Sequence, residues 1–144
     1  MNAPVAITRH WSKPLIVLLL LGLLGCNEPT SNDVAGSWIM TASSSRYLPA
    51  GLKGVSPSLL LHSDGSFSAS DLPGRFHGSV GVVDRNSGNG RWQLVKREGR
   101  QQVQITFDGG YGTQLEVSGT PRSPRLFYFV GDPDQGRKIE LTKR

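Results

Sequence analysis

The chain of 144 residues is poor in the residue types that most often carry chemistry. It contains one cysteine and three histidines. One cysteine excludes a disulfide framework within a single chain, and it excludes a metal site built from several thiolates. Charged residues make up 19% and hydrophobic residues 37% of the sequence, a balance that excludes a polar disordered chain and a membrane protein of many spans. The length leaves room for one domain.

Catalytic and metal-binding patterns are also scarce. No Gly-x-Ser-x-Gly motif is present, and the histidines beyond the first 26 residues, His62 and His77, are too few to hold zinc. Residues 132–136, Asp-Pro-Asp-Gln-Gly, have their glycine in fifth place, which favours a rigid hairpin turn over a calcium loop. We therefore expect no cofactor, no metal site and no enzymatic activity. Because carboxylate pairs can meet only in space, a hydrolase stays as the least favoured alternative.

Long hydrophobic runs are absent apart from one near the N-terminus, which extends from Leu15 to Leu24. Its ten residues reach about 15 Å as a helix, half of a hydrocarbon core of ~30 Å, and this length is typical of a signal peptide. The adjoining Leu23-Leu24-Gly25-Cys26 resembles the lipobox of bacterial lipoprotein precursors. The resemblance implies cleavage before Cys26 and a diacylglycerol group on its sulfur, so residues 1–25 are expected to be a lipoprotein signal peptide.

Processing at Cys26 would leave a lipidated tether, residues 26–33, and a single domain, residues 34–144. Residues 27–33 have no hydrophobic side chain beyond proline, which is typical of a flexible linker. Loss of the signal peptide removes two basic residues, so that 14 basic residues face 11 acidic ones; this modest balance argues against nucleic acid as a partner. We expect a cell-envelope protein whose first partner is the membrane, through acylated Cys26. The absence of Asp after the cysteine favours the outer membrane, facing the periplasm, if the source is Gram-negative.

The remainder of the chain predicts an all-β domain. After Val34 no segment keeps the apolar spacing of an amphipathic helix, whereas short β-prone runs alternate with glycine-containing turns. Short connections favour antiparallel neighbours, and about eight strands can close a barrel. We expect an antiparallel meander of about eight short strands that closes into a barrel. The predicted runs are 36–43, 58–62, 66–70, 79–83, 90–97, 101–107, 113–118, 125–131 and 137–143.

Alternation of apolar and polar side chains predicts how the strands pair. A three-residue loop at 63–65 pairs Leu61 with Phe67 and turns His62 outward. In the next hairpin, Trp92 faces Ile105, and a slip of one residue would expose the whole apolar set.

The last predicted hairpin carries apolar residues on both faces. We expect Phe127 and Phe129 to point inward, opposite Leu141 and Ile139. The other face of the same strand would then present Leu126, Tyr128 and Val130, with Arg125 at one end. Either residues 44–57 cover this stripe, or it is exposed and marks a partner site. We take Arg125, Leu126, Tyr128 and Val130 as the candidate partner surface.

The first predicted strand contains Gly36-Ser37-Trp38, which resembles the Gly-x-Trp motif that opens lipocalins and related small barrels. The resemblance implies a lipocalin-like barrel whose base is closed by Trp38, covered by a basic side chain of the last strand, Arg137 or Lys143. The chain departs from the family in its short length and in having no predicted helix before the first strand. Trp38 and Trp92 are the expected structural core, and ligand binding does not follow from the fold alone.

These observations favour a lipid-anchored, non-catalytic binding protein of the cell envelope that recognises a protein partner or a small amphipathic ligand. One alternative is a lipocalin-like carrier that holds a small apolar ligand in the barrel lumen. A second alternative is an envelope inhibitor or immunity factor. Many large inward side chains crowd so small a lumen, which favours recognition on the outer surface.

Overall fold

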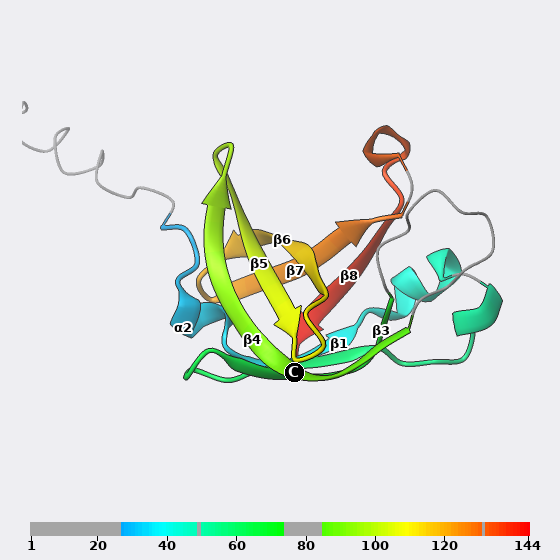
Figure 1. The fold of residues 1–144 in the computed structure, drawn as a ribbon. Helices are drawn as coiled ribbons and strands as arrows, with labels where there is room; N and C mark the ends of the chain where they lie inside the picture. The colour runs from blue at the N-terminus through cyan, green and yellow to red at the C-terminus, as the bar shows by residue number, and fades with distance from the viewer. Residues whose placement is uncertain (1–26, 49, 74–84, 131) are drawn as a thin grey trace, which may run out of the picture.

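The computed structural model describes residues 27–48, 50–73, 85–130 and 132–144. The predicted signal peptide, Cys26, the predicted strand 79–83 and His77 lie outside the described residues. In the part that is described, each strand runs antiparallel to its neighbour in sequence, and the first strand pairs with the last to close a barrel (Figure 1). The predicted lipocalin-like meander of eight strands is therefore confirmed.

The strands are joined by tight turns and by short helical segments, and their bounds follow the predicted runs with shifts of a few residues. The first strand stops at Met40, because a 3-10 helix takes over from Ala42. In chain order the elements are α2 (Ser31–Val34), β1 (Gly36–Met40), η2 (Ala42–Tyr47), η3 (Ala50–Leu52), β2 (Ser58–Leu61), β3 (Ser66–Pro73), β4 (Arg85–Arg97), β5 (Arg100–Phe107), β6 (Gly112–Thr120), β7 (Ser123–Phe129), η4 (Pro133–Gln135) and β8 (Lys138–Lys143).

Large side chains fill the interior of the barrel. Trp38 is fully buried and Trp92 is only 7% exposed, as expected for core residues. The rings of Phe67 and Phe107 meet edge to face with their centres 5.0 Å apart. An eight-strand barrel has just enough room for its inward side chains. The residues of this core are Val34, Trp38, Leu59, Leu61, Phe67, Leu72, Trp92, Val103, Ile105, Phe107, Leu115, Leu126 and Leu141.

One end of the barrel is closed by α2, a helix that the sequence did not lead us to expect. Thr30 and Asp33 form a capping box that starts this short helix. The indole Nε1 of Trp38 donates to the Val34 carbonyl oxygen over 2.9 Å, and the Nζ of Lys143 donates to the Asp33 carbonyl oxygen over 2.8 Å. Lys143, which pairs with Trp38 across β1 and β8, is thus the basic residue at the base.

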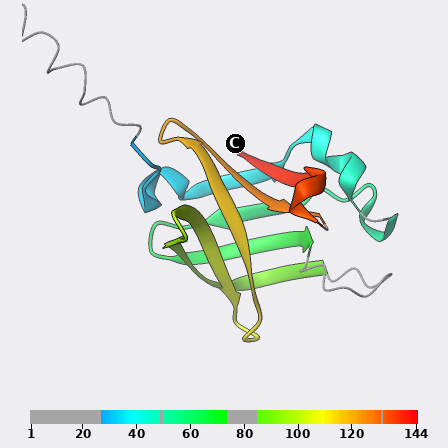
Figure 2. The same ribbon diagram turned by 90° about the horizontal axis from the view of Figure 1, so that it is seen from above.

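The opposite end is covered by η2 and η3, which lie across the barrel from α2 (Figure 2). Leu48 and Leu52 from this segment are buried with Ile139 in a second apolar cluster. Ser44 fixes the segment to β8, since its hydroxyl accepts a hydrogen bond from the Glu140 backbone N–H over 2.9 Å. Leu48 and Leu52 also contact Tyr128 and Val130, two members of the predicted stripe, so this segment covers part of the stripe, in line with one of the two sequence alternatives.

Both of the first predicted registers are confirmed. Leu61 pairs with Phe67, and His62 is exposed. Gly65 has φ +80°, the left-handed conformation that the bulged loop needs. Trp92 pairs with Ile105, and its Nε1 also donates to the His62 carbonyl oxygen over 2.8 Å.

The predicted register of the last hairpin is wrong by one residue. Leu126 pairs with Leu141, and Phe127 pairs with Glu140. Phe127 and Phe129 therefore share the outer face with polar residues, whereas Leu126 and Tyr128 point inward. The cause is the turn before β7: Thr120 pairs with Ser123 across a two-residue loop, which places Leu126 beside inward Val117.

Candidate functional site

The predicted partner surface on β7 does not exist as an exposed stripe. Leu126 is fully buried in the core. Tyr128 and Val130 are partly buried and pack against the cluster of Leu48 and Leu52. Of the four predicted residues only Arg125 is exposed, and its guanidinium is 2.7 Å from the Glu140 carboxylate. The structure overturns this site because the actual register turns its apolar members inward.

Tyr128 is unusual among the inward residues because its hydroxyl is buried and has no hydrogen-bond partner in the described part of the chain. Burial disfavours the charged phenolate and raises the pKa of Tyr128 well above its ordinary value of 10.0. Tyr128 is therefore neutral, and its hydroxyl points away from the surface on which we had expected a partner.

Phe127 and Phe129 take the place that we had assigned to Tyr128. Their rings pack edge to face on the outside of β7, with centres 5.5 Å apart, and both are partly buried. Lys138 from β8 lies over the Phe127 ring, 4.8 Å from its centre. An aromatic pair on an outer sheet face is the type of apolar surface that proteins use for recognition.

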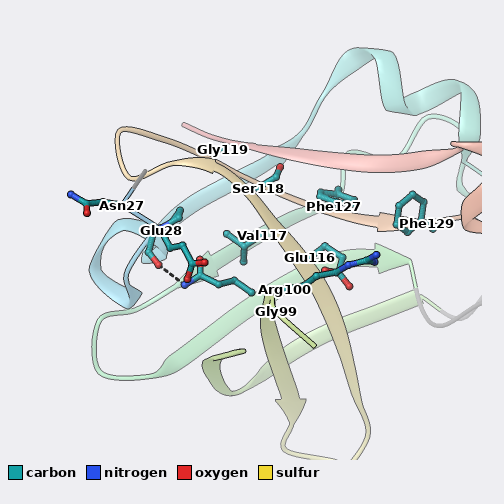
Figure 3. A pocket seen from close by; sticks show the side chains of 12 residues that line it. Asn27, Glu28, Gly99, Arg100, Glu116, Val117, Ser118, Gly119, Phe127 and Phe129 are labelled. Atoms are coloured by element: carbon teal, nitrogen blue, oxygen red, sulfur yellow. Dashed lines mark hydrogen bonds between the residues drawn. The ribbon is translucent and has the colours of Figure 1, made fainter. Parts of the chain in front are cut away.

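Next to this pair, strand β5 leaves strand β6 and opens a cleft. The last residues paired between them are Gln102 and Glu116, although β5 extends back to Arg100 and β6 extends on to Thr120. The β4–β5 hairpin thus bends away from β6 and β7 (Figure 1). The space between them is a cleft of about 510 Å³ (Figure 3). Its lining is Asn27, Glu28, Pro29, Gly99, Arg100, Gln101, Glu116, Val117, Ser118, Gly119, Phe127 and Phe129.

The N-terminal segment forms one wall of this cleft. The Lys96 Nζ is 2.8 Å from a carboxylate oxygen of Glu28, and the Gln101 side-chain amide donates to the Pro29 carbonyl oxygen over 2.9 Å. Pro29 itself is buried. Residues 27–33, which the sequence suggested as a flexible linker, instead pack on the barrel through these contacts and through α2.

The cleft combines an apolar floor with a charged rim. Phe127 and Phe129 supply the floor on the outer face, and Val117, whose side chain packs against the barrel core, lines the cleft where β5 and β6 part. Glu116 accepts a hydrogen bond from the side-chain amide of Gln102 over 2.7 Å. Arg100 is exposed and, within the described residues, has no ion-pair partner. This arrangement suits an amphipathic group whose apolar part lies on the rings and whose polar part meets the rim.

The other chemical candidates of the sequence are surface features. His62 is exposed beside Asp64, whose carboxylate accepts hydrogen bonds from the hydroxyl and the backbone N–H of Ser66, and these hold the pKa of Asp64 below its ordinary value. Residues 132–136 form the predicted turn: Asp132 accepts from the Asp134 N–H, and Gly136 is left-handed with φ +63°. Among the residues described, no group of three or more His, Cys, Asp or Glu side chains is placed to hold a metal ion. No helix in that same part of the chain is long and apolar enough to cross a membrane.

Sequence reasoning missed the cleft, although one signal for its aromatic pair was present. The two residues Pro121-Arg122 form a tight hairpin turn, and counting outward from it would have placed Phe127 on the outer face. Comparison of the chain with family models, with curated proteins and with solved structures finds no match.

Proposed function

We propose that this chain is a lipid-anchored, non-catalytic binding protein of the bacterial cell envelope. Its recognition site is the outer cleft between β5 and the Phe127–Phe129 pair, and its occupant is a protein partner or a small amphipathic ligand. The observation that carries this proposal is the contrast between a barrel interior filled by buried side chains and an outer cleft of about 510 Å³.

The packing of the barrel favours this function over a carrier of apolar ligands. Trp38, Phe67 and Phe107 occupy the space that a lumen ligand would need, and all three are at most 3% exposed. A well-packed interior cannot admit a further group without displacing these side chains, which costs free energy. The outer cleft needs no such rearrangement.

The anchor part of the proposal rests on Leu23-Leu24-Gly25-Cys26. Each buried CH₂ contributes about 0.8 kcal/mol to membrane binding, so two or more acyl chains on Cys26 hold a protein stably. Replacing Cys26 by Ala is expected to leave an unprocessed precursor without lipid, detected by its intact mass. Normal acylated mature protein from that variant would contradict the anchor.

The recognition part is tested by native mass spectrometry of the chain purified from its own envelope. We expect a retained mass on the natural protein, and loss of that mass in Phe129→Ser, which removes half of the aromatic floor. The matched control is Leu60→Ser: Leu60 is 38% exposed on the outer face of β2, across the barrel from β6. Retained mass in Phe129→Ser, or equal loss in both variants, would contradict the cleft as the site.

A further inference from the structure

We infer that the end of the barrel next to the N-terminal segment is a face that lies on the anionic headgroups of the membrane. This inference rests on the proposed anchor at Cys26 and adds how the barrel is held beneath it. It identifies the occupant of this face as a lipid surface, recognised through its negative charge.

The position of the anchor follows from covalent geometry. Cys26 directly precedes Asn27 in the sequence, and one trans peptide spans only about 3.8 Å between Cα atoms. Asn27 and Glu28 line the cleft, and Glu28 is held by Lys96 at the end of β4. The chain therefore leaves no long linker between the lipid and the barrel, and one end of the barrel must lie close to the bilayer.

That end is rich in exposed basic side chains. Arg97 ends β4, Arg100 starts β5, and Arg122 forms the turn between β6 and β7. All three are exposed, and none has an ion-pair partner in the described part of the chain. The turns that carry them lie at the same end as α2 in both ribbon views (Figures 1 and 2).

The C-terminal residues add to the same end. Lys143 and Arg144 are exposed next to the start of β1, where the Arg144 backbone N–H donates to the Ser37 carbonyl oxygen over 2.9 Å. The acidic side chains at this end are Glu28, which pairs with Lys96, Glu98 at the hairpin tip, and Asp33 and Asp64. Asp33 and Asp64 accept hydrogen bonds from Thr30 and Ser66, which favour the ionised carboxylates, so both keep their negative charge. These four carboxylates stand against six basic side chains, Lys96 included.

Among the described residues, the opposite end has no such excess. Its connections contain three acidic residues, Asp108, Asp132 and Asp134, and three basic residues, Arg46, Lys53 and Arg137. Basic side chains within a Debye length of an anionic leaflet, about 8 Å at physiological salt, are attracted to it. A barrel tethered at its basic end is therefore expected to lie with that end on the lipid, which also brings the mouth of the cleft to the membrane surface.

The experiment uses the acylated chain purified from membranes and reconstituted into vesicles. A fluorophore is attached at Ser123→Cys, next to Arg122, or at Ser43→Cys in η2 at the other end, since both serines are exposed. The vesicles contain either phosphatidylcholine alone or equal parts of phosphatidylcholine and phosphatidylglycerol, each with a lipid that carries a nitroxide quencher on its headgroup.

We expect strong quenching at position 123 and little at position 43 in the vesicles with phosphatidylglycerol. This difference in quenching between positions 123 and 43 should be lost at high salt, in phosphatidylcholine alone, and in a variant with Arg97→Gln, Arg100→Gln and Arg122→Gln. Equal quenching at the two positions, or a contrast unaffected by phosphatidylglycerol and by the arginine changes, would overturn the docking while leaving the anchor in place. An intact mass without the acyl group would overturn the anchor and the docking together.

Discussion

Trp92 offers the most demanding test of how this barrel is built. Its side chain is 7% exposed within the main core, opposite Ile105, and its indole N–H is bonded to the His62 carbonyl oxygen at 2.8 Å. Replacing a buried tryptophan by alanine costs about 3–5 kcal/mol, because apolar contact is lost and a cavity remains. The lost hydrogen bond adds about 0.5–1.5 kcal/mol at most. This contribution is small because His62 is exposed, so water can donate a hydrogen bond to its carbonyl oxygen in the variant.

A loss of this size is a large share of the roughly 5–15 kcal/mol that stabilises a domain. Equilibrium unfolding in urea measures it, as a lower midpoint with an unchanged slope. The control is Gln93→Ala, one residue along β4 on the outer face, where only the exposed hydrogen bond to Gln104 is lost. That change is expected to stay within about 0.5 kcal/mol. A cost below about 1 kcal/mol for Trp92→Ala, or equal costs for both variants, would refute the assignment of Trp92 to the inner face and Gln93 to the outer face of β4.

Three further results follow from the structure. Tyr128→Phe removes a buried hydroxyl without a partner among the described residues, so thermal melts should show unchanged or slightly higher stability; a loss above about 1 kcal/mol would reveal a hidden partner. Leu126→Ser should cost about 2–5 kcal/mol in urea melts and Phe127→Ser clearly less, since only Leu126 is fully buried; the reverse order would contradict the register of β7. Hydrogen bonds from the Thr30 hydroxyl and backbone N–H hold the pKa of Asp33 below its ordinary 3.8. These bonds therefore stabilise the folded state above the unfolded-state pKa, and this contribution is lost as the pH falls through the lower folded-state pKa. Thr30→Val should raise that pKa in an NMR titration, and an unmoved pKa would exclude the hydroxyl as the cause.

The sequence was informative wherever one face of a strand is apolar and the other polar. The segment from Ser66 to Ser70 alternates cleanly, and both its pairing with β2 and the left-handed Gly65 follow the prediction. The same holds for the hairpin around Trp92. In these strands a shift by one residue would expose the whole core face, so burial alone selects the register.

Strand β7 shows where that reasoning stops. From Leu126 to Val130 every residue is apolar or aromatic, so alternation cannot decide which face is buried. The register is set instead by the two-residue turn between Thr120 and Ser123, several residues earlier. Tyr128 consequently lies inside the barrel, and Phe127 and Phe129 lie outside it.

The cleft itself depends on features that no local pattern encodes. It exists because the β5–β6 ladder ends at Gln102 and Glu116 while both strands continue. Its second wall depends on contacts between Glu28 and Lys96, which are far apart in the chain. The helix α2, by contrast, carried a local signal, since Thr30 and Asp33 have the spacing of a capping box.

The central claim, that recognition takes place in the outer cleft beside Phe129, is tested most directly by site-specific photocross-linking in living cells. Benzoylphenylalanine replaces Phe129 in the cleft or, as the aromatic control, Tyr111, which is 47% exposed at the β5–β6 turn. We predict an adduct of defined mass from position 129 and none from position 111 after irradiation. An adduct from position 111 alone, or no adduct from position 129, would contradict the cleft as the binding site.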